Sequence, residues 1–182
     1  NWTAGGNIPA GTDRCNSAGA GTQTAGLLAA GDTTQAFEYD GSSWTSGGSI
    51  GSAGYNAAGF GIQTAGVIAG GSGDRDYAAT YDGSTWTAKN NLNTGRFYTA
   101  GTGTTTAGIV MGGVSPPGAV TANTETFDGT SWTEVGNLVT AKRSQSGGGD
   151  SATDALFWAG YTAADSNTME GYDGTSWSTR PS

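Results

Sequence analysis

The sequence has no histidine, a single cysteine and few charged side chains, and each shortage excludes a class of function. Only 12% of the 182 residues are charged. Without imidazole the chain cannot build a Ser-His-Asp triad, a Cys-His pair or a histidine metal site. The lone Cys15 cannot form an intrachain disulfide, and we interpret it as a small residue in a tight repeat. We therefore expect no cofactor, no metal centre and no enzymatic activity.

Positive charge and long apolar runs are also scarce. Lys and Arg number 7 against 15 Asp and Glu, which gives a net charge of −8. Nucleic-acid binding needs a cationic surface, so this balance argues against it and against anionic membrane surfaces. No stretch is long and apolar enough to span a bilayer, so we expect no membrane insertion. No signal peptide is visible, and residue 1 is Asn, so a fragment, a processed product and a partly identified chain all stay open.

What the chain does contain is a repeat marked by aromatic residues. A Trp followed by Thr or Ser recurs every 42 to 46 residues, at Trp2, Trp44, Trp86, Trp132 and Trp177. Four of these follow an aromatic-Asp-Gly turn, whose aspartates are Asp40, Asp82, Asp128 and Asp173. Asp-Gly between β-prone residues is a strong hairpin signal, because Gly tolerates positive φ. Regular aromatics also oppose disorder, which the 34 glycines and sparse aliphatic residues would otherwise favour.

Each repeat offers two more strands ahead of this turn. A short apolar run ends in Gly, as in residues 67–71 and 109–113, and a small-residue segment precedes it, as in 57–61 and 99–103. Four strands in such a period are typical of a propeller blade, with the small residues at the crowded axis. The prediction is an all-β protein, a β-propeller of four four-stranded blades. It forms one domain over 1–182, with repeats at about 3–44, 45–86, 87–132 and 133–177.

These motifs resemble the kelch repeat, in which an apolar run ending in Gly-Gly is followed by Tyr-Asp, Trp and a Thr-x-x-Arg-like step. Thr94-Gly95-Arg96 and Thr140-Ala141-Lys142-Arg143 echo the last step, with Arg14 at the matching place in the first repeat and Gly54 in the second. The Gly-Thr-Gln-Thr-Ala-Gly and Asp-Gly-Ser-x-Trp-Thr segments are also similar to tandem repeats in proteins of marine tailed phages. That resemblance implies a virion or fibre context. The Asp-box of sialidase-like propellers fails to match by one residue, because Gly83 directly follows Asp82.

Closure of the ring is ambiguous, because there are five Trp strands and only four complete sets of the others. A self-closed four-blade ring with one spare strand is the favoured interpretation. A window from a longer array and a larger ring or fibre of several chains stay open.

The candidate contact surface lies in the linkers that vary most between repeats. In repeat proteins, function tends to lie where the copies differ. The residues that we single out are Asp74, Arg75, Asp76, Tyr77, Phe97, Tyr98, Ser115, Pro116, Pro117 and Asn123. The Asp74-Arg75-Asp76 segment lacks the loop signature of a calcium site. Arg14, Arg96 and Arg143 could clamp an anionic sugar, but their recurrence favours a structural role such as capping carbonyls.

Two functions of different classes follow. The first is a non-enzymatic structural or adhesion module, extracellular or in a virion, that engages a surface glycan, a protein or neighbouring copies in a fibre. The alternative is a glycoside hydrolase that uses Glu125 and Glu170, which share a register on adjacent repeats. Glu38 lies close to that register. We interpret these glutamates as solvated positions on the third strand, which favours the first function.

Overall fold

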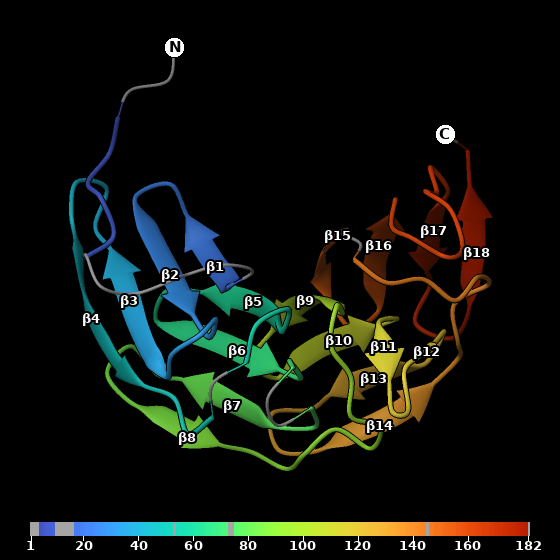
Figure 1. Ribbon diagram of the computed structural model, residues 1–182, viewed down its shortest axis with the longest axis horizontal. Helices are drawn as coiled ribbons and strands as arrows, with labels where there is room; N and C mark the ends of the chain where they lie inside the picture. Colours follow the sequence, from blue (N-terminus) through green and yellow to red (C-terminus); the bar gives the residue numbers. More distant parts are fainter. Residues whose placement is uncertain (1–3, 10–16, 53, 73–74, 145, 182) are drawn as a thin grey trace.

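The described residues form four antiparallel sheets of four strands and one short hairpin (Figure 1). The computed structural model describes residues 4–9, 17–52, 54–72, 75–144 and 146–181. The first sheet contains β1 (Ala18–Thr22), β2 (Ala25–Ala29), β3 (Gln35–Tyr39) and β4 (Trp44–Ser49). The second contains β5 (Ala58–Ile62), β6 (Ala65–Ala69), β7 (Ala78–Tyr81) and β8 (Trp86–Ala88). The third contains β9 (Ala100–Thr104), β10 (Ala107–Met111), β13 (Thr124–Phe127) and β14 (Trp132–Val135). The fourth contains β15 (Ser146–Ser151), β16 (Asp154–Trp158), β17 (Met169–Tyr172) and β18 (Trp177–Arg180). The hairpin contains β11 (Val114–Ser115) and β12 (Ala119–Val120).

The all-β class and the repeated four-stranded sheets are thus confirmed. In every sheet the strands lie side by side in chain order, from the small-residue strand to the Trp strand. Trp44, Trp86, Trp132 and Trp177 each begin the last strand of a sheet. Trp2 lies outside the described residues, as do Arg14, Cys15 and Asp74.

The Asp-Gly hairpins have the same geometry in all four sheets. In the second sheet the Asp82 carboxylate accepts hydrogen bonds from the backbone N–H groups of Ser84 and Thr85, at 2.9 and 2.8 Å. Gly83 has a φ of +92°, a left-handed conformation that its lack of a side chain permits. The bonds favour the charged carboxylate, so the backbone N–H of Thr85 first and then its hydroxyl lower the pKa of Asp82.

A Trp ring packs on the aromatic residue that precedes each of these turns. The ring centroids are 4.9 Å apart for Tyr81 and Trp86 and 4.7 Å apart for Phe127 and Trp132. The two residues face each other across the pair of outer strands, so the hairpin register itself brings the rings together. The repeated aromatic-Asp-Gly-x-x-Trp segment is therefore one local unit.

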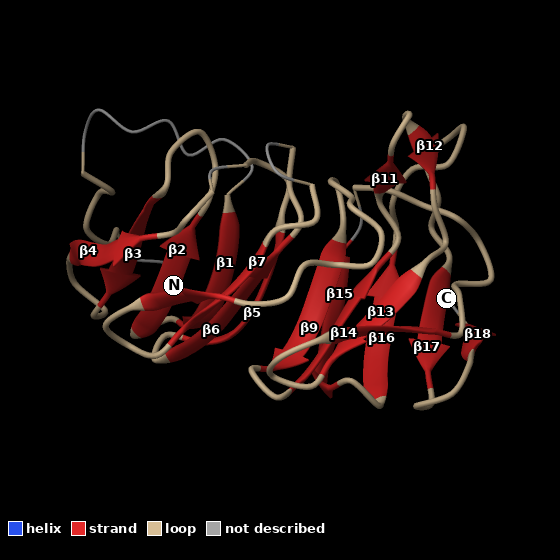
Figure 2. Cartoon of the chain, turned by 90° about the horizontal axis from the view of Figure 1, so that it is seen from below, coloured by secondary structure: helices blue, strands red, loops and turns tan. Residues whose placement is uncertain are grey.

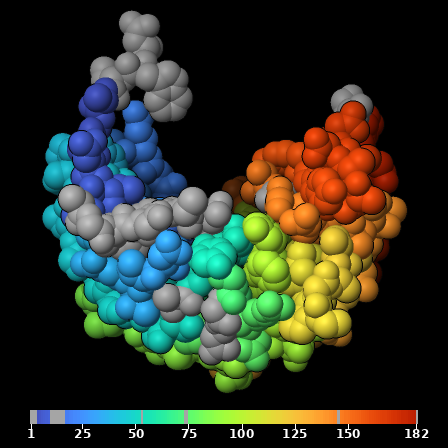
Figure 3. All heavy atoms as spheres, viewed as in Figure 1, coloured from blue at the N-terminus to red at the C-terminus, as the bar shows by residue number. Residues whose placement is uncertain are grey.

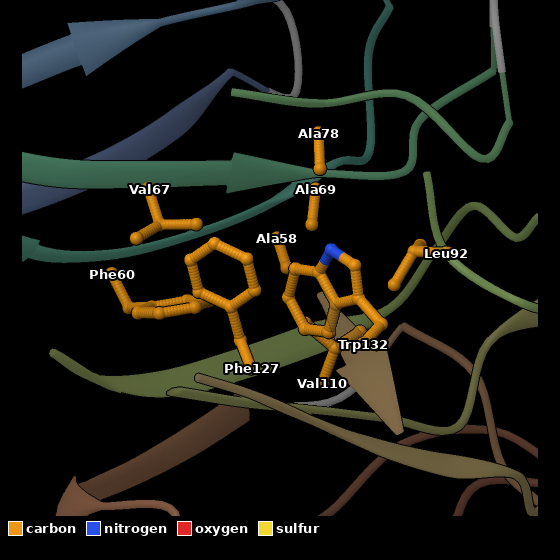
Figure 4. Packing of buried hydrophobic residues seen from close by; sticks show 9 residues of the cluster. All are labelled: Ala58, Phe60, Val67, Ala69, Ala78, Leu92, Val110, Phe127 and Trp132. Atoms are coloured by element: carbon orange, nitrogen blue, oxygen red, sulfur yellow. The ribbon is translucent and has the colours of Figure 1, made fainter. Parts of the chain in front are cut away.

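Apolar side chains fill the spaces between successive sheets. Between the second and third sheets, Phe60 and Val67 pack with Val110, Phe127 and Trp132 (Figure 4). A side chain at Gly101 or Gly108 would collide with the Phe60 ring, so these glycines leave room for it. The small residues of the inner strands thus accept side chains from the preceding sheet.

The four sheets are arranged around an arc. The inner strand β1 lies beside β5, β5 beside β9, and β9 beside β15. The first and fourth sheets stand on opposite sides of an opening (Figures 1 and 3). The described residues therefore do not show the arc closing, and closure into a propeller stays a prediction.

The described residues at the two ends of the chain contact the sheets in different ways. Strand β18 pairs with β17, so the C-terminal Trp177 belongs to the fourth sheet. Residues 4–9 lie against the hairpin of the first sheet, where the Trp44 indole N–H donates to the Gly6 carbonyl at 3.1 Å. Trp86 donates in the same way to the Gly47 carbonyl of the preceding sheet, at 3.0 Å. The Trp strand of the fourth sheet is therefore the C-terminal one, and Trp2 lies outside the described residues.

Candidate functional site

The variable linkers extend beyond one end of the sheets. The β11–β12 hairpin projects furthest there (Figure 2). Its base is tied to the start of the third sheet, because Phe97 and Val114 exchange backbone hydrogen bonds at 3.1 and 2.8 Å. We call this end of the molecule the loop face.

Two arginines lie over aromatic rings on the loop face. The Arg143 guanidinium is 4.8 Å from the ring centre of Tyr161 and 5.4 Å from that of Tyr98. The Arg75 guanidinium is 4.8 Å from the Phe97 ring centre, and the Phe97 and Tyr98 rings are 4.9 Å apart. We call these five residues the cation–aromatic cluster. All five are partly or largely exposed, so the cluster presents flat apolar surface and positive charge to solvent.

The backbone fixes the place of this cluster. Tyr98 has a φ of +54°, and its N–H donates to the Asn56 carbonyl at 2.9 Å. The Tyr98 carbonyl accepts from Ser144 N–H at 3.0 Å, and Asn56 and Ser144 also have positive φ. Arg143 and Tyr161 exchange backbone bonds at 3.0 and 2.9 Å. The bonds of Tyr98 join neighbouring sheets and those between Arg143 and Tyr161 join two segments of the fourth sheet, so the rings are held on a common surface.

The structure divides the residues that the sequence proposed for this surface. Arg75, Phe97 and Tyr98 belong to the cluster, and Ser115, Pro116 and Pro117 lead into the exposed turn of the hairpin. Two others make bonds within the chain. The Tyr77 hydroxyl accepts from Gly51 N–H at 3.0 Å, and the Asn123 carbonyl accepts from Arg96 at 2.6 Å. Asp76 is partly buried beside them, with its carbonyl bonded to Leu92 N–H at 2.8 Å.

Arg143 was considered as a clamp for an anionic sugar but interpreted as structural, and Tyr161 was not singled out by name. Tyr161 stands in a variable linker, which was a usable signal. Arg143 was grouped with Arg96, and this grouping was wrong. Strand pairing aligns Ala100 with Ser146, so Lys142 is the residue that matches Arg96. Arg143 matches Phe97 instead and is therefore free of the structural role of Arg96.

The expectation that Glu125 is solvated was wrong. Glu125 and Arg96 are fully buried and form an ion pair. The Glu125 carboxylate also accepts from the backbone N–H groups of Asn93 and Thr94, at 2.8 and 3.1 Å. Burial lowers the pKa of Arg96, and the adjoining Glu125 carboxylate opposes this shift. Arg96 also donates to the Thr94 and Asn123 carbonyls, which is the capping role expected of it.

The fourth sheet repeats this arrangement with a lysine. Lys142 Nζ lies 3.1 Å from the carboxylate of Glu170, and both side chains are buried. The same carboxylate accepts from Val139 N–H at 2.7 Å. Each glutamate is therefore bound by its own cation and by the segment that leads into its sheet, instead of facing a solvent cleft.

This placement bears on the chemistry of the alternative function. A glycosidase needs two carboxyl groups that reach the substrate from opposite sides. Glu125 and Glu170 are buried in separate sheets. In the described part of the chain, no group of His, Cys, Asp and Glu is arranged to hold a metal ion. Over the same residues, no helix is long and apolar enough to cross a membrane.

Comparison with known proteins does not assign a function to this site. A scan against protein-family models finds none that matches the chain, and a search of curated proteins finds no match. The inference of function therefore depends on the geometry of the loop face.

Proposed function

We propose that the chain is a non-enzymatic binding module that engages a surface glycan or protein through its loop face. The observation that carries the proposal is the cation–aromatic cluster, above all Arg143 between the Tyr98 and Tyr161 rings. Aromatic faces stack on sugar rings or on apolar protein side chains at a small entropic cost. Arginine adds a fork of N–H donors for carboxylate, sulfate or hydroxyl groups.

The location of the cluster supports the same proposal. It lies where the repeats differ in sequence, beside the exposed β11–β12 hairpin, and its backbone is held by bonds between sheets. A rigid frame with variable loops at one end is a common way to build a recognition surface. Buried ion pairs account for Arg96, Glu125, Lys142 and Glu170, which leaves the cluster as the best-supported contact surface.

A wider setting is part of this proposal. The four sheets are consistent with blades of a kelch-like propeller, and the sequence resembles repeats of marine tailed phage proteins. We propose on this basis a structural or adhesion component of a virion or fibre, placed outside the cell. In such a setting the loop face would meet a host surface, or neighbouring copies in a fibre.

A glycan array with the purified chain tests the proposed contact. We expect binding to be lost or weakened at least tenfold in Arg143→Ala and Tyr161→Ala, which remove one cation and one ring. Ile62→Ala is the matched control, because Ile62 is an exposed apolar residue at the far end of β5. A binder that tolerates both cluster variants would place the contact surface elsewhere.

A hydrolysis screen on the same glycans tests the non-enzymatic part. We expect no turnover by the native chain. Turnover that disappears in Glu125→Gln or Glu170→Gln, while the variant stays folded by circular dichroism, would contradict the proposal and favour the hydrolase.

A further inference from the structure

Each internal sheet has one face toward the preceding sheet and one toward the following sheet. In β10, Val110 packs in the cluster shared with the second sheet. Its neighbours Ile109 and Met111 pack in the cluster shared with the fourth sheet. Side chains alternate along a strand, so this division holds for the second strand of every sheet. Within the described part of the chain, the two outermost faces of the arc are the ones without a neighbouring sheet.

The outer face of the fourth sheet exposes large apolar side chains. Strand pairing places Leu156 and Trp158 in β16 where β10 has Ile109 and Met111. Leu156 and Trp158 are each 39% exposed, whereas Ile109 and Met111 are 0% exposed. The difference arises because a sheet covers β10 on this side and none covers β16. We call Leu156 and Trp158 the donor face.

The outer face of the first sheet has room for such side chains. In the other sheets, side chains of the preceding sheet pack against the matching glycines. A Cβ at Gly66 would collide with Leu27, and one at Gly147 would crowd Met111. Gly19 and Gly26 hold the same positions in the first sheet, but among the described residues a Cβ there would meet only atoms of the first sheet itself. We call Gly19, Gly26 and the partly exposed Leu28 the acceptor face.

Residues 4–9 cover only the outer part of this side of the first sheet. They lie near Tyr39 and Trp44, as the segments between sheets do elsewhere. The acceptor face lies on β1 and β2, closer to the axis. The donor and acceptor faces border the same opening of the arc (Figures 1 and 3).

We propose that the donor face of one copy of this chain packs against the acceptor face of a second copy, so that two arcs close one ring. A second copy is the expected occupant, because at each internal interface another sheet of this repeat covers the equivalent residues. A head-to-tail contact either closes by rotation or grows into a filament. Here the two faces of one copy border one opening, so a second copy turned by a two-fold rotation meets both.

Sedimentation velocity over a range of concentrations tests the proposal. The native chain should approach twice its 18.1 kDa mass as concentration rises. Trp158→Glu and Leu28→Glu should each weaken this association at least tenfold, because each places a charge in the contact. Ile62→Glu, at a more exposed apolar position on the second sheet, should leave it unchanged. Circular dichroism establishes that each variant is folded.

Mixing the two variants tests the head-to-tail arrangement. In a mixed pair, the Leu28→Glu chain has a native donor face and the Trp158→Glu chain has a native acceptor face. One of the two contacts in that pair is therefore fully native, so the mixture should associate more strongly than either variant alone. A mixture that stays as weak as its components overturns the arrangement. A monomer at every concentration, or an assembly that keeps growing beyond two copies, overturns the closed pair. None of these results depends on ligand binding at the loop face.

Discussion

The second and third sheets share one backbone arrangement but differ in the side chains at two matching positions. In the third sheet the position beside Val110 is Glu125, paired with Arg96. In the second sheet the same two positions are Ala79 and Gly54, so both charges are absent together. The fourth sheet retains both, as Glu170 and Lys142. A buried charge without its partner is strongly unfavourable, so the absence of both charges from the second sheet leaves neither one unpaired while the backbone frame stays the same.

The largest expected effect comes from a substitution that breaks the buried ion pair between Glu125 and Arg96. Glu125→Ala leaves Arg96 charged in a fully buried site and removes the acceptor for two backbone N–H groups. We expect the free energy of unfolding to fall by about 3–5 kcal/mol, as for a broken buried pair. Chemical denaturation with urea measures it.

A double variant provides the matched control. Arg96→Met with Glu125→Leu replaces both charges by apolar groups, and we expect it to recover most of the loss. If the double variant is no more stable than Glu125→Ala, burial of the lone charge is not the cause of the loss.

The next effect compares Trp residues at matching positions. Trp132 is buried between the second and third sheets, whereas Trp44 of the first sheet is only partly buried. Trp132→Ala should lower the free energy of unfolding by about 3–5 kcal/mol, the range for a buried aromatic. Trp44→Ala should lower it by about 1 kcal/mol, because most of the ring's surroundings are solvent or residues 4–9. Equal losses in urea titrations would show that an uncovered interface contributes as much as a covered one.

The smallest effect concerns the hairpin that all four sheets share. Bonds from the turn backbone lower the pKa of Asp82, so its stabilising effect is complete above the ordinary aspartate pKa. It is lost as the pH falls through the lowered folded-state value. The gap in melting temperature between the native chain and Asp82→Asn should therefore be largest at neutral pH and shrink in strong acid. Asp154→Asn, an exposed aspartate outside the turns, is the control, and a gap that widens in acid would contradict the assignment.

Local patterns were sufficient to predict the strands of the four sheets and their order, but not the short β11–β12 hairpin. The Asp-Gly turns, the apolar runs and the regular Trp spacing involve residues that are close in sequence, so each hairpin is encoded within its own segment. Glu125 looked like a surface residue because the groups that bury it are distant in the sequence. Its partner Arg96 lies in the segment that enters the sheet, and neighbouring sheets contribute to its burial. The grouping of Arg143 with Arg96 failed because their spacing to the next strand differs by one residue.

The sequence by itself therefore determined four sheets of four antiparallel strands, each with a Trp strand at its outer edge. Only the tertiary structure decided which charges are buried, that Tyr98, Arg143 and Tyr161 from two sheets lie together, and that the arc has two uncovered faces. The physical reason is that a hairpin is stabilised by bonds between near neighbours. The burial of a side chain and the curvature of the arc depend instead on how whole sheets pack against one another.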